Sequence, residues 1–352
     1  MEQFYNAIDL LKGMIAIPSI SREESEVADY LFAAWQAEGH KVYRKGNNLW
    51  MITPNYDETK KTLLLNAHID TVKPTDNWTA DPFTPILSDD GERLYGLGSN
   101  DDGASLVSLY TTYTTLASTP QAYNLIFVAS AEEEISGRQG IECVLPELPP
   151  ISFAVVGEPT GMQPAIAEKG LMVIDCKSIG KSGHAARNEG VNAIMEAMKD
   201  IAWFDKHRFP LKSELLGEVK MSVTIIHAGT QHNVVPATCD FTVDIRSNEL
   251  YTNEALFEQI KESISCEVKA RSFRLNSSSI PSSHPFVQRA ILMGKTPFGS
   301  PTMSDQALMP FPTVKIGPGD SARSHTADEY IRLSEIQEAI ALYVRLLDRL
   351  IF

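Results

Sequence analysis

The sequence has few cysteines and no long hydrophobic run. Only four of its 352 residues are cysteine. They lie far apart, with no CxxC pair and no histidines spaced as in a zinc knuckle. This usage is typical of a reducing compartment. No window approaches about 18 consecutive apolar residues, so we expect no membrane-spanning segment. The N-terminus has Glu2 near its start and no apolar signal-peptide core, so we expect a cytoplasmic protein.

Positive charge is also scarce. The chain has 31 Lys and Arg against 45 Asp and Glu, a formal net charge of −14. Nucleic acid and anionic membranes are bound by basic surfaces, so we expect neither as a partner. A hydrophobic content of 43% and a charged content of 22% are ordinary for a globular protein. A chain of this length is long enough for two domains.

The stretch that organises the chain is Thr62–Val72, TLLLNAHIDTV. Its apolar run is typical of a buried strand, and His68 and Asp70 stand at the end of that run. Side chains two positions apart on a strand point to the same side. A metal-binding imidazole usually donates its other N–H to a carboxylate, and HxD fits that pairing. Alone, such a histidine is more often structural.

Acidic and histidine residues recur at the ends of later segments. Apolar strands are predicted at Asn124–Ser130, Ile151–Val156 and Thr313–Ile316, and the loop Leu94–Asp102 leads into an apolar helix. Strands that alternate with helices and end in polar residues predict an α/β sheet with one site along its edge. The residues at these ends are His68, Asp70, Asp101, Glu133, Glu134, Glu158 and His325.

These residue types favour a divalent metal. Carboxylate oxygens mixed with imidazole nitrogens suit zinc or a similar ion. Asp101, Glu134 and Glu158 in one buried cleft would repel one another. Two divalent cations and a bridging hydroxide would balance their charge, and the spare acid in Glu133-Glu134 could deprotonate the attacking water. A single loop carboxylate is more often only solvated, so the prediction depends on the whole set.

The domain organisation changes after Lys169. The following segments read β-α-β-β-α-β, the order of a ferredoxin-like α+β domain. The Ser- and Pro-rich segment Asn276–Pro285 is typical of a linker back to the first domain. We therefore predict one domain built from 1–168 and 277–352, with an inserted lid or dimerisation domain at 169–276. Near the N-terminus, Ser21 and Glu24 predict a capping box that starts the second helix.

The sequence resembles the M20 metallopeptidase family, which includes acetylornithine deacetylases, succinyl-diaminopimelate desuccinylases, aminoacylases, dipeptidases and carboxypeptidases. The matching motifs run in family order over nearly the full length. They are NAHIDTV, YGLGSNDDGAS, SAEEE, VVGEPT, SGHAAR, HNVVPA followed by DIR, and GPGDSARSHTADEY. The resemblance implies a zinc-peptidase-like α/β fold, with a mixed sheet sandwiched by helices.

The resemblance also implies roles for the residues at the strand ends. Two zinc ions, with cobalt as a substitute, would be bridged by Asp101 and a water or hydroxide. The peptide bond after Asp101 would be cis. The remaining assignments are His68 and Glu158 at one metal, Glu134 and His325 at the other, Glu133 as general base and Asp70 as the residue that orients His68.

Three residues of the inserted domain have implied roles. His184 resembles the residue that reaches the partner subunit's active site and stabilises the oxyanion, which implies a homodimer. Asn233 and Arg246 resemble groups that bind the substrate carboxylate, and the planar fork of arginine suits that task. A surface or capping role for His184, and a salt bridge from Arg246 to Asp244, are the alternatives.

The expected reaction is removal of an N-acyl group from an amino acid. N-acetylornithine or N-succinylornithine is the expected substrate, in arginine biosynthesis. Succinyl-diaminopimelate, acetyl-lysine and small peptides are the alternative substrates. A protein that is an inactive M20-like scaffold is a further alternative, and so is a site that binds a single metal ion. Leu97 and Gly103 replace a common Arg and Lys of the family, but no predicted ligand is lost. Met303 replaces a polar residue that contacts the substrate in the family, which leaves the acyl group open.

Overall fold

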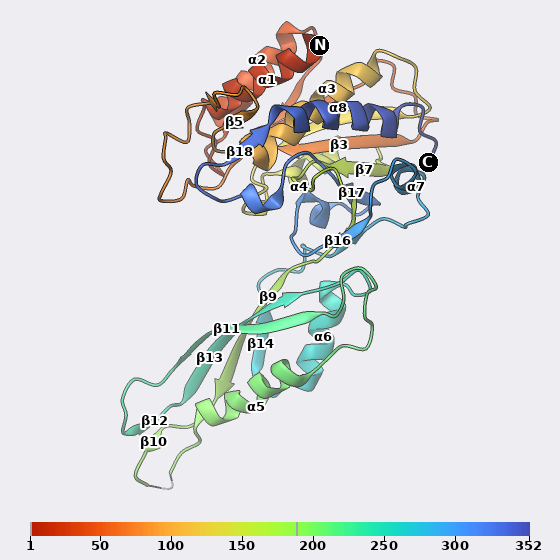
Figure 1. Cartoon of the computed structure of the whole chain (residues 1–352). Helices are drawn as coiled ribbons and strands as arrows, with labels where there is room; N and C mark the ends of the chain where they lie inside the picture. Colours follow the sequence, from red (N-terminus) through yellow and green to blue (C-terminus); the bar gives the residue numbers. More distant parts are fainter. Residues whose placement is uncertain (1, 188) are drawn as a thin grey trace. The chain divides into compact units, whose positions relative to one another are not determined.

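The computed structural model describes residues 2–187 and 189–352 (Figure 1). The chain divides into two compact units. Unit 1 consists of Met1–Ile166, Ser279–Phe298 and Ser304–Phe352, and unit 2 consists of Ala167–Ser278 and Gly299–Met303. Within the described ranges, no helix has both the length and the apolar character needed to cross a membrane.

Unit 1 is built around a mixed sheet of nine strands. The inner strands β6, β3, β7 and β17 are parallel, whereas β2 and β8 flank them in antiparallel register. The order is β1 (Tyr43–Lys45), β2 (Asn48–Ile52), β6 (Asn124–Ser130), β3 (Thr62–His68), β7 (Phe153–Val156), β17 (Thr313–Lys315), β8 (Ala165–Glu168) and β15 (Ser278–Ser279), with β16 (Phe298–Ser300) paired to β8.

Both faces of this sheet are covered. On β3, Leu63 and Leu65 point into one hydrophobic core and Leu64 into the other, and all three are fully buried. Continuous apolar strands are expected where both faces are buried. The predicted fold, a mixed sheet between helices, is confirmed. The first core takes in α1 (Glu2–Ile15), α2 (Ser25–Ala37), α3 (Ala104–Ala117), α7 (Pro285–Leu292) and α8 (Leu333–Leu347), and the second takes in α4 (Ile141–Val144) and the helical turn Asp305–Leu308.

A second, antiparallel sheet of unit 1 lies next to the loop that precedes α3. Its strand order is β18 (Tyr330–Arg332), β5 (Arg93–Tyr95) and β4 (Ile86–Leu87). Tyr330 pairs with Tyr95, so residue 329 lies opposite residue 96. The sheet thereby joins the segment after His325 to the loop that carries Asp101.

The predicted capping box of the second helix is wrong. Helix α2 begins at Ser25, and the residue before it, Glu24, makes no side-chain cap hydrogen bond. Ser21 instead donates its hydroxyl to Asp70 Oδ2 at 2.7 Å. Glu24 is fully buried and accepts the main-chain N–H of Arg22 at 2.7 Å. A partner 49 residues away, invisible to a local pattern, determines the position of the Ser21 side chain.

Unit 2 has the ferredoxin-like order. Its sheet order is β11 (Lys220–Ala228), β13 (Thr238–Arg246), β9 (Met172–Ile179) and β14 (Glu267–Ala270), all antiparallel. Helices α5 (Ala193–Lys206) and α6 (Asn253–Ser263) pack on one face and share a single hydrophobic core with it. The short strands β10 (Gly183–His184) and β12 (Val234–Val235) pair with each other.

Asn253 provides a test of how unit 2 is held together. Its buried amide donates to the main-chain oxygens of Leu171, Phe273 and Leu275 at 2.8–3.3 Å and accepts from Ser247 at 2.9 Å. We expect Asn253→Ala to lower the free energy of unfolding by about 3 kcal/mol, because several buried polar groups lose their partner. Urea denaturation followed by circular dichroism measures this change.

The matched control is Asn55→Ala, at an exposed position. Surface substitutions of this kind change stability by less than about 0.5 kcal/mol. Equal denaturation midpoints for the two variants would contradict the role of Asn253.

Candidate metal centre

The residues predicted at the strand ends lie in unit 1, at the carboxyl edge of its parallel strands. His68 is the last residue of β3, and the acidic turn at 132–134 follows β6. Glu158 follows β7, and His325 lies beyond β17. Since β6, β3, β7 and β17 are parallel neighbours, their carboxyl ends converge. Residues far apart in sequence are brought to one site in this way.

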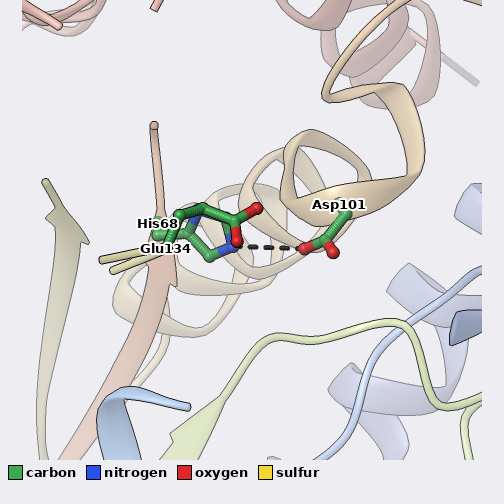
Figure 2. Close-up of side chains that lie close together, drawn as sticks. All are labelled: His68, Asp101 and Glu134. Carbon is green, nitrogen blue, oxygen red and sulfur yellow. Dashed lines mark hydrogen bonds and ion pairs between the residues drawn. The ribbon is translucent and has the colours of Figure 1, made fainter. Parts of the chain in front are cut away.

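Asp101 lies between the two histidines. Its Oδ1 is 3.2 Å from His68 Nε2, and its Oδ2 is 3.7 Å from His325 Nε2. Figure 2 shows the Asp101 carboxylate facing the His68 ring, with Glu134 beside that ring. The Asp101–Asp102 peptide bond is cis, as the resemblance implies. A carboxylate with one oxygen toward each imidazole is arranged as a bridge between two cations would be.

Two overlapping groups of side chains are close enough to hold metal ions. His68, Asp101 and Glu134 form one group, and His68, Glu133 and Glu158 form the other. Within each group the candidate ligand atoms lie within 4.8 Å of one another. His325 is half exposed and lies 3.0 Å from Glu134 Oε2. The groups therefore contain every residue predicted to bind metal except His325, which joins them through Glu134 and Asp101.

The electrostatics of the cluster favour bound cations. Burial, reinforced by the charge of Glu158, raises the pKa of Glu133 well above its usual value. Burial, reinforced by Asp101, does the same to the pKa of Glu158. Burial opposes ionisation of Asp101 too, but hydrogen bonding from His68 holds its pKa below the usual value. The oxygen and imidazole donors, together with their unbalanced negative charge, fit divalent ions.

Asp70 has a wider role than the predicted one. His68 Nδ1 lies 2.9 Å from the main-chain oxygen of Asp70 and 3.5 Å from its carboxylate. The nearer partner of the imidazole is therefore the peptide carbonyl. The Asp70 carboxylate accepts the main-chain N–H groups of Glu133 at 3.0 Å and Glu134 at 3.2 Å, besides the Ser21 hydroxyl. Asp70 thus also fixes the turn that carries both glutamates.

Two buried acids near the centre were not singled out from the sequence. Asp305 accepts a 2.6 Å hydrogen bond from Ser130, and burial raises its pKa to about 6. Glu329 accepts main-chain N–H groups of the loop that precedes Asp101. Burial, with the Asp101 charge, raises the pKa of Glu329 to about 8. Both stand in stretches aligned with the family, TMSD and HTADEY, which would have been the signal to examine them.

The structure brings two of the three predicted residues of unit 2 together. His184 in β10 pairs with Val234, and the N–H of Ala185 donates to the Asn233 oxygen at 3.0 Å. Both His184 and Asn233 are exposed. His184 Nδ1 accepts the N–H of Ala186 at 3.1 Å, which holds the ring in one orientation.

Arg246 lies elsewhere in unit 2. It ends β13, whose opposite end at Thr238 leads back to β12. Its guanidinium donates to both carboxylate oxygens of Asp244, at 2.8 and 3.1 Å. The salt bridge considered as the alternative is therefore present, and binding of a substrate carboxylate by Arg246 remains a prediction.

Comparison with known families shows which family this chain belongs to. The model of peptidase family M20/M25/M40 matches residues 64–349. The chain belongs to this family. It is therefore a hydrolase that acts on amide bonds, as expected from the motifs. M20 enzymes are metal-dependent, in agreement with the donor set at the strand ends.

Relatives of the M20 chain cover almost its full length. The acetylornithine deacetylase of Proteus mirabilis is 28% identical, over 97% of this chain and 96% of that protein. The acetylornithine deacetylase of Pectobacterium atrosepticum is 28% identical, over 92% of each. Among solved structures, aminopeptidase PepT from Bacillus cereus has a TM-score of 0.78 at 19% identity and covers 98% of both chains.

YxeP of Bacillus subtilis, a dinuclear metal binding peptidase of the M20 family, has a TM-score of 0.74 at 16% identity and covers 98% of both chains. At 19% and 16% identity, the likeness to PepT and YxeP establishes the fold of this chain and nothing beyond the fold.

His68 belongs to both groups of candidate ligands, so its loss tests the whole centre. We expect the wild-type protein to retain about two divalent ions per chain and His68→Ala to retain about one or none. Elemental analysis after dialysis against zinc measures this. His40→Ala is the control, because His40 packs against Tyr110 and lies outside both groups. Equal metal content in the two variants would contradict the assignment of His68.

Proposed function

We propose that this M20 enzyme removes the acyl group from an N-acylated amino acid, with N-acetylornithine or N-succinylornithine as its substrate. The observation that carries the hydrolytic site is the Asp101 carboxylate, which faces His68 and His325 with one oxygen each. The choice of an acylated ornithine is supported by the acetylornithine deacetylases that match this chain over nearly its full length. With ornithine as the product, the reaction would belong to arginine biosynthesis.

We propose two zinc ions as the cofactor, with cobalt able to replace them. His68, Asp101 and Glu158 would hold one ion, and Asp101, Glu134 and His325 the other. The buried carboxylates repel one another without cations, which supports a site for more than one positive charge. Ions bound there would polarise the amide carbonyl and lower the pKa of the attacking water.

Glu133 is the proposed proton carrier. Its carboxylate lies 3.9 Å from His68 Nε2, close to the candidate ligands. It takes a proton from water as the oxygen attacks the acyl carbon, and it returns the proton to the nitrogen when the C–N bond breaks. Asp70 holds the main chain at Glu133 and Glu134, so the carboxylate of Glu133 stays in place through both transfers.

A homodimer is the proposed assembly. Strand β11 is at the edge of the unit 2 sheet, and Ile225 and Ile226 on it are 46% and 51% exposed. Helix α5 packs beside it and exposes Met195 and Met198. An open sheet edge can pair with another chain, and an exposed apolar patch marks an interaction site. We propose that a second copy of the chain covers it.

The spread of the unit 2 residues also supports a second copy. His184 and Asn233 lie beside β12, whereas Arg246 ends β13, nine residues long. At about 3.3 Å per residue, the two ends of β13 are roughly 26 Å apart, farther than an N-acylated amino acid spans. With two copies of the chain, the β12 end of one unit 2 sheet and the Arg246 end of the other can both reach one substrate. We propose that His184 of the second copy stabilises the negative oxygen of the tetrahedral intermediate. Asn233 of the second copy and Arg246 of the first would bind the substrate carboxylate.

The cytoplasm is the proposed location. All four cysteines are free thiols, as is usual in a reducing compartment.

Hydrolysis of three substrates side by side tests the proposed reaction. We expect the zinc-loaded protein to prefer N-acetylornithine or N-succinylornithine to succinyl-diaminopimelate. Glu133→Gln should lower kcat by about 10²–10⁴-fold when assayed at saturating zinc, because the proton carrier is lost. Release of free amine measures each rate.

The matched control is Glu132→Gln. The Glu132 carboxylate accepts the N–H of Gln139 at 3.3 Å and belongs to neither group of candidate ligands, so its rate should stay near that of the wild type. Turnover of none of the three substrates would refute the proposed substrate class. Full activity of Glu133→Gln would refute the role of Glu133.

Mixing two inactive variants tests the shared site. His184→Ala and Glu133→Gln should each be nearly inactive alone. After the two are unfolded and refolded together, about a quarter of wild-type activity should return, because half of randomly paired dimers are mixed and each holds one complete site. No recovery, with mixed dimers demonstrated by mass spectrometry, would contradict a site shared between subunits. A monomer in sedimentation equilibrium would contradict the dimer itself.

A further inference from the structure

Glu329 is a buried acid whose carboxylate is surrounded by main-chain donors. It is 2% exposed. Its Oε1 accepts the N–H of Asn100 at 2.8 Å and of Asp101 at 2.9 Å, and its Oε2 accepts the N–H of Gly98 at 3.1 Å. The Glu329 main-chain oxygen accepts the N–H of Gly96 at 3.1 Å. One residue therefore holds four N–H groups of the loop that leads to Asp101.

The conformation of the loop makes this arrangement possible. Gly98 has φ 77°, in the left-handed region that glycine adopts without strain. A Cβ at this position would come within 2.7 Å of Thr71 Cγ2. Neighbouring residues of opposite hand turn their N–H groups toward one point and form a concave anion site. In this protein the anion is the side chain of Glu329.

The loop sets the position of the Asp101 carboxylate. Asp101 must direct one oxygen to His68 and the other to His325, at 3.2 and 3.7 Å. Its own N–H is bound by Glu329. A rotation of the main chain here would carry Asp101 away from one imidazole or the other. The hydrogen bonds of Glu329 oppose that rotation.

We propose that Glu329 is a positioning residue that sets the metal affinity of the centre by fixing the loop of Asp101. It acts through Asp101 and needs no contact with metal or substrate. The inference rests on the proposed metal centre, and it is independent of the identity of the acyl group. Glu329 lies in the segment HTADEY, which matches the M20 family.

Two variants separate this role from a purely structural one. Glu329→Ala removes both acceptor oxygens and with them all three side-chain hydrogen bonds. Glu329→Gln keeps one oxygen for Asn100 and Asp101 but turns an amide N–H₂ toward the N–H of Gly98. Loss of a residue that orients a metal ligand typically weakens metal binding 10–100-fold. We expect about 100-fold weaker zinc binding for Glu329→Ala and about tenfold for Glu329→Gln, measured by competition with a chelator of known affinity.

The matched control is Asp200→Asn in unit 2. Asp200 is also buried, and its carboxylate accepts two main-chain N–H groups, of Ser265 and Cys266, each at 3.0 Å. Like Glu329→Gln, this substitution alters a buried carboxylate that binds main-chain N–H groups, but it lies outside the metal centre. Asp200→Asn should lower the melting temperature and leave zinc affinity unchanged. The kcat of Glu329→Gln should recover in excess zinc while its KM stays near the wild-type value.

The possible results test the proposed metal centre and the proposed role of Glu329 separately. If wild-type protein binds no zinc, the proposed metal centre is wrong and the role of Glu329 falls with it. If wild-type protein binds zinc and folded Glu329→Gln binds it equally well, the positioning role is wrong and the centre stands. If Glu329→Ala does not fold, Glu329→Gln alone decides.

Discussion

Repulsion between buried carboxylates is the constraint on which this structure depends. Glu133, Glu134, Glu158 and Asp101 converge at one edge of the sheet, where burial disfavours their ionised forms. Such a cluster would disperse if the loops that carry it were free to move. The parallel strands β6, β3, β7 and β17 prevent this, because both faces of their sheet are packed into hydrophobic cores. The stability of the cores thus holds charges together that would otherwise separate.

The loops beyond the strands are held by further acids. Asp70 binds the N–H groups of the turn at 133–134, Glu24 binds the N–H of Glu132, and Glu329 binds those of the loop before Asp101. Peptide N–H groups are suited to this task because they neutralise part of a carboxylate's charge without adding a titrating group. The centre therefore consists of acids that are candidate metal ligands and of further acids that hold the main chain of the first set in place.

The two units contribute different residues to the proposed active site. Unit 1 contains every candidate metal ligand, whereas His184, Asn233 and Arg246 lie in unit 2. Within unit 2, Arg246 is separated from His184 and Asn233 by the length of β13, and the strand at the sheet edge exposes Ile225 and Ile226. Both features have a common explanation in the proposed dimer, since pairing of two copies would cover the edge and bring opposite ends of the two sheets to one substrate.

The sequence alone determined the class of fold, and it predicted the central strands and the candidate residues of the centre. Buried parallel strands are continuous apolar runs and their polar ends follow directly, so His68 and the glutamates could be singled out without coordinates. Asp101 could be singled out from the loop that leads into an apolar helix. Only the tertiary structure decided which partner each side chain takes. Ser21 binds Asp70 instead of capping a helix, His68 contacts the Asp70 carbonyl more closely than its carboxylate, Arg246 pairs with Asp244, and Glu329 reaches across more than 220 residues to the loop of Asp101. Patterns in sequence reflect local periodicity, whereas these hydrogen bonds depend on how distant segments meet.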